Sequence, residues 1–279
     1  MSGKIEMYHV DAFTERPFTG NPTAVCLLNK FPADQWMQSM AAEMNLSETA
    51  FVCPADHGFQ LRWFTPTTEV DLCGHATLAA SHVLWEAGRL PVDQTVFFQT
   101  LSGELSACRR GNLIELDFPS EPPVPHDPPP ELLAAISCTP VFFGQNKMDY
   151  LIEVASVEEV ENIKINMQRL SSLPVRGLIV TAQCDQPEYD FVSRFFAPAV
   201  GVNEDPVTGS AHCCLAPYWG NKLGLGRMKA YQASRRGGVI ELEIVPDRVV
   251  LGGNARTIFR GVLAIDSSES TTPSDAGQD

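Results

Sequence analysis

The chain has 279 residues, of which 44% are hydrophobic and 19% charged, values typical of a globular protein long enough for two domains. Its formal net charge of -14 disfavours nucleic acid as a partner, because phosphate binding needs clustered lysines and arginines. No run approaches the roughly 20 apolar residues of a membrane helix, and residues 1–6 lack the apolar core of a signal peptide. We therefore expect a cytoplasmic protein that does not enter a membrane.

The first half of the chain combines strand patterns with two helices. Residues 33–44 carry large apolar side chains at helical spacing and stop at Asn45, which predicts an amphipathic helix. Residues 75–86 follow Gly74 and end at Gly88, and their apolar run predicts a buried helix. Strands are predicted at residues 5–13, 23–28, 47–53, 59–64, 95–100, 103–109 and 112–118.

A proline-rich segment separates this half from a second one. Residues 119–130 are so rich in proline that neither a helix nor a central strand can form there. We predict a first domain of residues 1–118, a linker of residues 119–130, a second domain of residues 131–265 and a disordered tail of residues 266–279. The second half predicts a helix after Gly209 and strands at residues 141–143, 150–154, 177–182, 189–196 and 239–244, with two more around Gly252-Gly253.

The two halves share a local pattern. Each contains Phe-x-Pro, then an Asp, then a Gly that opens a helix. Superposing Gly74 on Gly209 places His75 on Ser210 and favours an ancient duplication. The matched segments are Phe64-Thr65-Pro66 with Asp71-Leu72-Cys73-Gly74-His75-Ala76, and Phe196-Ala197-Pro198 with Asp205-Pro206-Val207-Thr208-Gly209-Ser210-Ala211.

The two matched glycines, Gly74 and Gly209, are candidates for substrate binding. Exposed backbone N–H groups and the helix dipole make a helix start an anion site. Two such starts that face each other across a domain cleft are suited to hold a carboxylate or another polar group of a substrate. The alternative is that each Gly serves only the turn and close packing; the matching positions favour a site.

Glu48 is the first candidate for acid–base chemistry. By strand alternation its side chain shares a face with Ala50 and Val52. A carboxyl group that is buried on an apolar face is suited both to take and to give a proton near neutral pH. The alternative is a Glu48 that lies in water on an edge strand or caps a turn.

Three further polar residues lie near the matched glycines. Asp205 is a second acidic candidate, and its alternative role is to cap the turn before Gly209. His75 at a helix start can donate a hydrogen bond or titrate, or it can be a satisfied structural histidine. Ser210 lies in Thr-Gly-Ser-Ala, which lacks the Gly-x-Ser-x-Gly elbow of serine hydrolases.

The sequence contains no recognisable metal or nucleotide site. It has no Cys-x-x-Cys pair, and no zinc spacing surrounds the adjacent Cys213 and Cys214. Neither a Gly-x-Gly-x-x-Gly nor a phosphate-binding loop is present. We therefore predict no metal and no organic cofactor.

Five segments, in order and spacing from residue 5 to about residue 265, closely resemble the PhzF-like family of phenazine-biosynthesis-type isomerases. The resemblance implies two similar α/β domains of the diaminopimelate-epimerase type. Each would be a curved, mostly antiparallel sheet around a central helix, with the active site between them. The segments are Asp11-Ala12-Phe13, Phe18-Thr19-Gly20-Asn21-Pro22, Asn45-Leu46-Ser47-Glu48-Thr49-Ala50-Phe51-Val52, Asp71-Leu72-Cys73-Gly74-His75-Ala76-Thr77 and Glu204-Asp205-Pro206-Val207-Thr208-Gly209-Ser210-Ala211.

The resemblance also implies roles for individual residues and an assembly. In the phenazine enzyme a glutamate at the position of Glu48 moves a proton within dihydro-hydroxyanthranilate. By the same resemblance His75, Asp205 and Ser210 line the site, and the backbone at Gly74 and Gly209 meets the substrate. Asn21 and Cys73, which lie in matching segments, are further candidates for substrate contact. Family members are commonly homodimers.

One departure from related epimerases separates the possible mechanisms. Those racemases use two facing cysteines, and Cys73 occupies the first place, but no thiol stands between Asp205 and Thr208. We therefore predict a cofactor-independent isomerase of a small anionic substrate, with Glu48 as a single proton shuttle. The alternatives are an amino- or hydroxy-acid epimerase that uses Glu48 and Asp205, and a non-catalytic ligand-binding module on the same fold.

Overall fold

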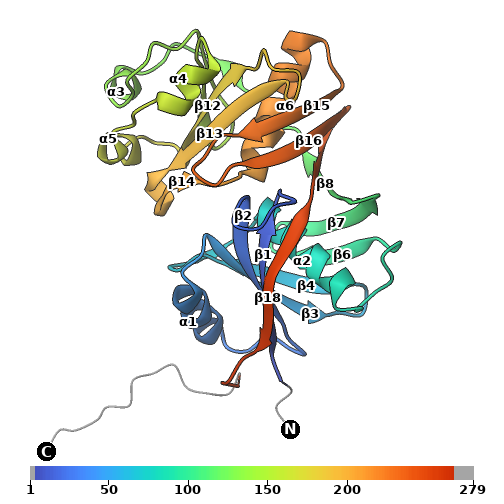
Figure 1. Cartoon of the computed structure of the whole chain (residues 1–279). Coiled ribbons are helices and arrows are strands. Elements are labelled where there is room, and N and C mark those ends of the chain that lie inside the picture. The colour runs from blue at the N-terminus through green and yellow to red at the C-terminus, as the bar shows by residue number, and fades with distance from the viewer. Residues whose placement is uncertain (1–3, 267–279) are drawn as a thin grey trace, which may run out of the picture.

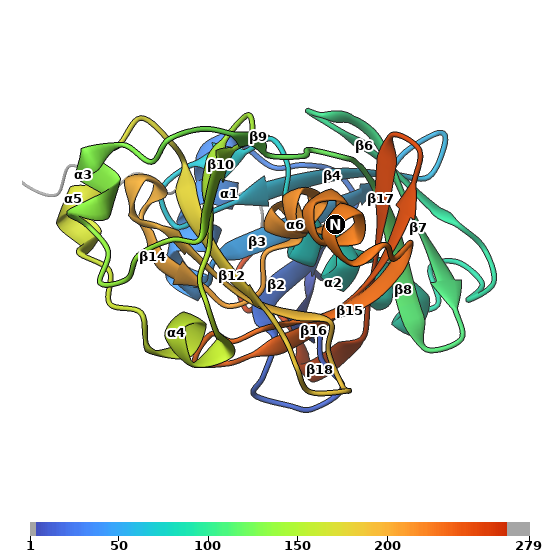
Figure 2. The same ribbon diagram turned by 90° about the horizontal axis from the view of Figure 1, so that it is seen from above.

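Two helices, one in each half of the chain, are each surrounded by a curved sheet. The computed structural model describes residues 4–266. Helix α2 (Gly74–Glu86) lies in the lower lobe of Figure 1 and helix α6 (Gly209–Leu223) in the upper lobe. Seen from above, α6 has strands of its sheet on both sides (Figure 2). The predicted two-lobed α/β fold and both predicted central helices are confirmed.

The strands of each lobe follow the same spatial order. Each set runs antiparallel, parallel, antiparallel, parallel, antiparallel and antiparallel from its first strand to its last. The first set is β1 (Glu6–Ala12), β2 (Asn21–Leu27), β3 (Glu48–Pro54), β4 (Phe59–Phe64), β6 (Val96–Thr100), β7 (Gly103–Arg110) and β8 (Leu113–Pro119). The second set is β10 (Phe142–Gln145), β11 (Asp149–Glu153), β12 (Gly177–Gln183), β13 (Phe191–Ala197), β15 (Arg227–Gln232), β16 (Gly238–Val245) and β17 (Arg248–Gly253).

The shorter elements complete this scheme. Strand β5 (Glu69–Val70) pairs with β4, and β14 (Val202–Asp205) pairs with β13. Helix α1 (Asp34–Met44) covers the outer face of the first sheet, and the second lobe adds α3 (Pro130–Leu133), α4 (Val157–Asn162) and α5 (Met167–Ser171). Pairing of β8 with β17 joins the two sheets into one continuous sheet.

The strand register and one arginine–glutamate ion pair also repeat between the lobes and support the predicted duplication. Thr49 pairs with Phe64 in the first lobe and Leu178 with Phe196 in the second, which matches the two Phe-x-Pro segments. Two residues before each phenylalanine an arginine lies over its ring and binds a glutamate with Nε and Nη2. The pairs are Arg62 with Glu69 and Arg194 with Glu204.

The last strand of each half crosses to the other lobe. Strand β18 (Ala255–Val262) pairs with β1, and the two-residue β9 (Val124–Pro125) pairs with β10. The pairing of β18 differs from the predicted bounds, which place residues 255–262 in the second domain. Residues 124–125 lie in the predicted linker, where a helix and a central strand were excluded, and form only this short strand. Strand β18 covers an edge of β1 that would otherwise expose unpaired backbone groups, and local sequence carries no trace of so distant a partner.

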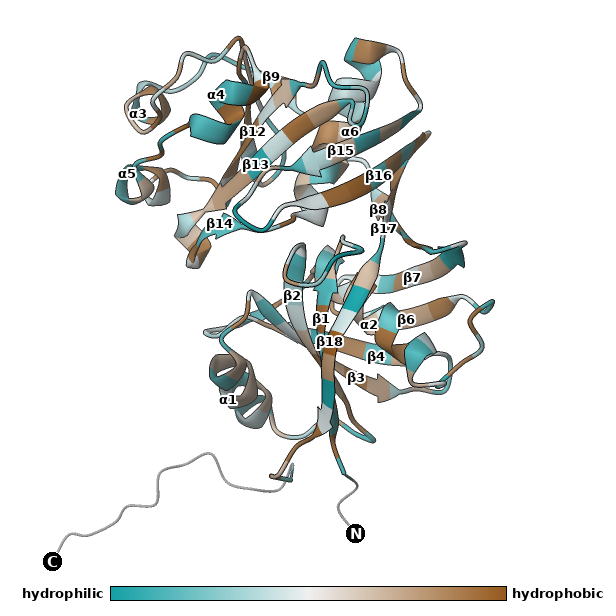
Figure 3. Cartoon of the chain, in the orientation of Figure 1, coloured by the Kyte–Doolittle hydropathy of each residue, from teal (hydrophilic) through white to brown (hydrophobic). Residues whose placement is uncertain are grey.

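The central helices are buried on all sides because their residues are apolar and often small. Ala76, Ala79 and Ala80 of α2 let the sheet approach closely, and Leu78 and Leu84 fill the space between. Figure 3 shows the hydrophobic residues of the surrounding strands. Truncating Leu78 to Ala would cost about 2–5 kcal/mol, the usual range for a fully buried leucine.

Helix α1 forms a separate, smaller core outside the first sheet. Trp36, Met37 and Met40 pack on Phe51 in this cluster. Asn45 ends the helix with a left-handed backbone (φ 50°), so the predicted helix and its stop are confirmed. The prediction of a disordered tail concerns residues that, apart from Asp266, lie outside the described part of the chain.

Candidate active site

The starts of the two central helices meet where the lobes touch. A Cβ atom added to Gly74 would lie 3.5 Å from the Cα of Gly209, and one added to Gly209 would lie 3.3 Å from the Leu251 side chain. The chain therefore brings the two predicted helix starts together, and glycine permits the close approach of their backbones.

A cavity of about 410 Å³ opens beside these helix starts, and both lobes line it. Its size suits a small organic molecule. The sequence-predicted residues that line it are Glu48, Cys73, Gly74, His75, Asp205, Gly209 and Ser210. The structure thus gathers seven of the eight candidates on one cavity, although they come from segments as far apart as residues 48 and 210.

Glu48 projects into this cavity from the first position of β3. Alternation along β3 directs it to the same side as Ala50 and Val52, which pack in the core around α2. Its Oε2 lies 3.0 Å from Nε2 of His75 in a close ion pair, without the alignment of a hydrogen bond. The side chain is 16% exposed, and neither of its oxygens makes a hydrogen bond with any of residues 4–266; Oε2 is the buried one.

His75 is buried between Glu48, Cys73 and Asn21. Burial alone would lower the pKa of His75, but the adjacent Cys73 sulfur and the Glu48 carboxylate more than offset it and hold that pKa well above its usual range. Nδ1 lies 3.1 Å from the amide nitrogen of Asn21, a contact that instead favours an unprotonated Nδ1. Both influences leave a proton on Nε2, the nitrogen that faces Glu48.

The structure places Asn21 differently from the predicted substrate contact. It is fully buried at the start of β2 and is not among the residues that line the cavity. Besides His75, its amide donates to Oδ1 of Asp205 at 2.8 Å and to the carbonyl of Val207 at 2.9 Å. Asn21 therefore holds His75 and Asp205 in position from behind, where it joins the two lobes.

Asp205 is almost entirely committed to hydrogen bonds. Oδ1 accepts from Asn21, and Oδ2 accepts from the Thr208 hydroxyl at 2.5 Å. Gln232 donates to its backbone carbonyl at 2.7 Å. Burial raises the pKa of Asp205, while His75 and the two donors act in the opposite direction. Both donors to the carboxylate are side chains, and the backbone N–H of Thr208 donates to Gln232 instead, so Asp205 does not cap the turn as the alternative predicted.

Cys73 and Thr208 stand at matching positions, each directly before a central helix. Burial, aided by the nearby Glu48 carboxylate, raises the pKa of the Cys73 thiol to about 11. The position that matches Cys73 therefore carries a hydroxyl in place of the second thiol of a two-cysteine racemase. The other cysteine that lines the cavity, Cys213, lies further along α6.

Three of these residues could also coordinate a metal ion. One ligand atom from each of Glu48, Cys73 and His75 lies within 4.8 Å of the others. Sequence spacing did not reveal this group, because Glu48 comes from a different strand. The thiol must lose its proton to coordinate, and its raised pKa opposes that loss.

Arg176 is a cavity residue that the sequence analysis missed. It directly precedes β12, lines the cavity and donates from Nη2 to the Ser210 hydroxyl at 3.0 Å. The same side chain binds the buried carboxylate of Asp149. A single arginine forms no recognisable motif in the sequence. Extending the repeat alignment would have placed Arg176-Gly177 on Ser47-Glu48 and so drawn attention to Arg176.

The same register shows what stands opposite Glu48. Glu48 precedes Thr49, and Gly177 precedes the matching Leu178. A Cβ atom at Gly177 would lie 2.6 Å from the ring of Phe195 and 2.7 Å from the carbonyl of Phe196. The second lobe therefore has no room for a carboxylate that would match Glu48.

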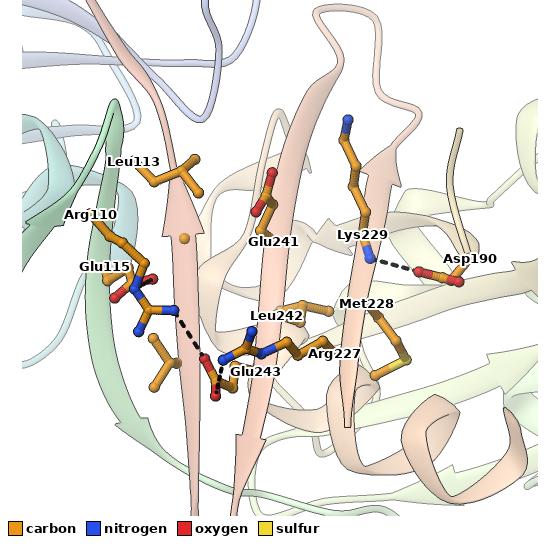
Figure 4. Close-up of a pocket in the computed structure, with 12 residues that line it drawn as sticks. Arg110, Leu113, Glu115, Asp190, Arg227, Met228, Lys229, Glu241, Leu242 and Glu243 are labelled. Atoms are coloured by element: carbon orange, nitrogen blue, oxygen red, sulfur yellow. Dashed lines mark hydrogen bonds and ion pairs between the residues drawn. The ribbon is translucent and has the colours of Figure 1, made fainter. Parts of the chain in front are cut away.

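A second hollow, of about 350 Å³, lies over β15, β16 and β17 (Figure 4). Four of its charged groups are paired with each other: Arg110 binds Glu115 and Glu243, and Arg227 also binds Glu243. Asp190 accepts from the backbone of Lys229. It lacks the buried acid–imidazole pair found beside the helix starts. The cavity at the helix starts is therefore the candidate active site.

Comparisons with known proteins agree with this architecture. The sequence profile of the PhzC-PhzF family, described as "Phenazine biosynthesis-like protein", matches residues 10–261. An uncharacterized isomerase of Halalkalibacterium halodurans is 52% identical over 260 residues, which cover 93% of this chain and 98% of that protein. A PhzF-family crystal structure from Enterococcus faecalis has a TM-score of 0.90 at 40% identity, covering 94% of this chain and all of that one.

More distant structures share the fold alone. A probable proline racemase from Agrobacterium radiobacter aligns with a TM-score of 0.66 at 12% identity, covering 95% of this chain and 94% of that one. Within residues 4–266, no helix has the length and apolar character needed to cross a membrane. By profile, identity and fold, the chain belongs to the phenazine biosynthesis-like (PhzC-PhzF) family.

Proposed function

We propose that this protein is a cofactor-independent isomerase that moves a proton on a small carboxylate-bearing substrate, with Glu48 as the acid–base group. Membership of a family in which several relatives are named isomerases supports the reaction class. The expected surroundings, cytoplasmic and homodimeric, remain predictions from the sequence.

The observation that carries the proposal is the contrast between the two acids beside His75. Both oxygens of Asp205 accept hydrogen bonds, from Asn21 and Thr208, so this carboxylate is fixed. Neither oxygen of Glu48 accepts a hydrogen bond from residues 4–266, and Oε2 lies beside Nε2 of His75. A base needs a free oxygen within reach of the proton that it removes, and of these two acids Glu48 has one.

Proton transfer follows from this arrangement. The Glu48 carboxylate takes a proton from a substrate carbon, and the electron pair left behind is delocalised toward an electron-withdrawing group of the substrate. The protonated Glu48 then returns the proton to another carbon on the same face. Acid–base help of this kind contributes about 10²–10⁴-fold, and backbone N–H groups at the helix starts stabilise the negative charge that develops.

The His75 proton on Nε2 supports the Glu48 carboxylate between turnovers. This N–H group stabilises the negative charge of Glu48. The interaction becomes weaker when Glu48 has taken the substrate proton and is neutral. Asn21 keeps the imidazole in place through Nδ1. His75 is thus proposed to support Glu48, with Asp205 as a fixed neighbour.

An epimerase that uses Glu48 and Asp205 as opposed bases is the alternative reaction. It requires Asp205 to release one of its two donors, and the matched position Gly177 supplies no replacement acid. A non-catalytic binding module is the alternative of another class. It has no need of a carboxylate oxygen without a donor beside a buried imidazole.

The test is isomerisation of a cell-extract component by wild-type protein and by two Glu→Gln variants. Wild type should convert one carboxylic acid into a compound of equal mass and different retention. Glu48→Gln should retain the acid unchanged, because the amide cannot accept a proton. Glu104→Gln, at an exposed position of β7, is the matched control and should behave as wild type. Full conversion by Glu48→Gln would refute the assignment of Glu48.

A further inference from the structure

Arg176 is held on the second-lobe side of the cavity by a buried carboxylate. Its Nε donates to Oδ1 of Asp149 at 2.9 Å, and Nη2 donates to Oδ2 of the same residue. Asp149 is fully buried at the start of β11, so the guanidinium is fixed against a rigid strand end. The ring of Phe195 lies 5.1 Å below it.

Part of this guanidinium is left for a ligand. Arginine has five N–H donors, of which Asp149 and Ser210 occupy three. The remaining two belong to Nη1, which makes no hydrogen bond with any of residues 4–266. The side chain is 28% exposed and lines the cavity. A planar guanidinium of this kind binds a carboxylate with defined orientation.

Ser210 places a second donor beside this group. It is the second residue of α6, whose first backbone N–H groups have no partner within the helix. Its hydroxyl accepts from Nη2 of Arg176, so the hydroxyl proton remains free to be donated. Arg176, Ser210 and the start of α6 therefore converge on one part of the cavity, on the lobe opposite Glu48.

The rest of the cavity wall is mostly apolar. Leu72 and Phe118 contribute from the first lobe, and Met148, Phe195 and Val202 from the second. Such a wall suits a flat hydrocarbon body. The other charged residues in the lining, Asp71 and Glu121, are acidic and offer no site to an anion. The charged part of a ligand is thus best placed at Arg176.

We propose that Arg176, with Ser210, binds the substrate carboxylate at the start of α6 and so turns the reacting carbon toward Glu48. Arg176 is then the residue that makes the site selective for an anion on an apolar, planar body. The orientation rests on the proposed function, whereas the charge selectivity can be measured without turnover.

Calorimetric titration with benzoate and its neutral isostere benzamide tests the proposal. Wild type should bind benzoate at least about tenfold more tightly than benzamide, the scale of a charge-assisted hydrogen-bond pair. The double variant Arg176→Gln/Asp149→Asn removes both charges and keeps neutral hydrogen-bonding groups. It should lose that preference while its affinity for benzamide changes less than about twofold.

The neighbouring strand β13 of the same lobe offers a matched control outside the cavity. Arg194 binds Glu204 with the same two nitrogens and lies over Phe196, but it does not line the cavity. Arg194→Gln/Glu204→Gln should therefore keep the benzoate preference. If the Arg176 double variant does not fold, Arg176→Lys replaces it, and a preference reduced by at least about threefold is expected.

Three results would overturn the proposal. Wild type could fail to prefer benzoate. The Arg176→Gln/Asp149→Asn variant, or Arg176→Lys in its place, could keep the full preference, or it could lose benzoate and benzamide binding equally. The two proposals fail separately. If the protein shows no turnover but prefers benzoate in an Arg176-dependent way, only the proposed function is wrong. If turnover depends on Glu48 but the benzoate preference is absent, only the role of Arg176 is wrong.

Discussion

Two buried polar residues of β2 should respond oppositely to apolar substitution. Asn21 and Thr23 are both fully buried and lie two positions apart. Asn21 donates to Asp205, to the Val207 carbonyl and to His75, whereas Oγ1 of Thr23 has no partner. Asn21→Leu would remove the two N–H donors that these three buried contacts share, and Thr23→Val would remove an unsatisfied hydroxyl.

The magnitudes follow from these contacts. A buried group left without its partner costs about 1–3 kcal/mol, so the loss of two donors in Asn21→Leu should lower the free energy of unfolding by at least about 2 kcal/mol. At about 2–4 °C per kcal/mol for chains of 150–250 residues, Tm should fall by at least roughly 4–8 °C. Thr23→Val should be neutral or raise stability by up to about 1 kcal/mol, because the desolvated hydroxyl disappears.

Thermal unfolding followed by tryptophan fluorescence at pH 7 measures both changes. The four tryptophans are buried in the two lobes and should report the whole transition. Thr49→Val on β3 provides a further control, because Oγ1 of Thr49 is also buried without a partner. A loss below about 1 kcal/mol for Asn21→Leu, or a larger loss for Thr23→Val, would refute the role given to Asn21.

Three further predictions concern the thiol, metals and pH. Cys73→Ser should retain most of the turnover that Glu48→Gln abolishes, because no thiol faces Cys73; a dead Cys73→Ser with an active Glu48→Gln would reverse the roles. Metal analysis should find no stoichiometric ion, and chelator treatment should leave activity unchanged; activity lost with chelator and restored by one metal would contradict this. Burial lowers the pKa of His212 to about 4, so the unfolded chain takes up its proton first as pH falls below about 6.5. About 3 kcal/mol of stability should be lost by pH 4 through this group. A His212→Gln variant should lack that part of the pH dependence in urea unfolding. A variant with the same pH dependence as wild type would contradict the role of His212.

Local patterns predicted those parts of the fold that depend on local interactions. Helix α1 and its stop at Asn45 follow from apolar spacing and a left-handed backbone. The central helices follow from apolar runs after Gly74 and Gly209. The exchange of β9 and β18 between lobes could not be predicted, because it depends on pairing with strands elsewhere in the chain.

The candidate site shows the same division. Strand alternation correctly directed Glu48 toward the core around α2, and the repeat brought the two helix starts together. Asn21 was given a substrate contact because it lies in a motif, yet its amide is used up between the lobes. Arg176 escaped notice because its carboxylate partner, Asp149, is 27 residues away, and only the folded strands bring them together.

The position of solvent label in the product tests the central claim most directly. The acid converted in the cell-extract experiment is isomerised in heavy water, and deuterium at the newly protonated carbon is measured by mass spectrometry after one turnover. A single Glu48 carboxyl that is largely shielded from water should return part of the original proton, so the label should be clearly below one deuterium per product. Essentially complete labelling, together with inversion at the same carbon, would show two opposed bases and contradict the account.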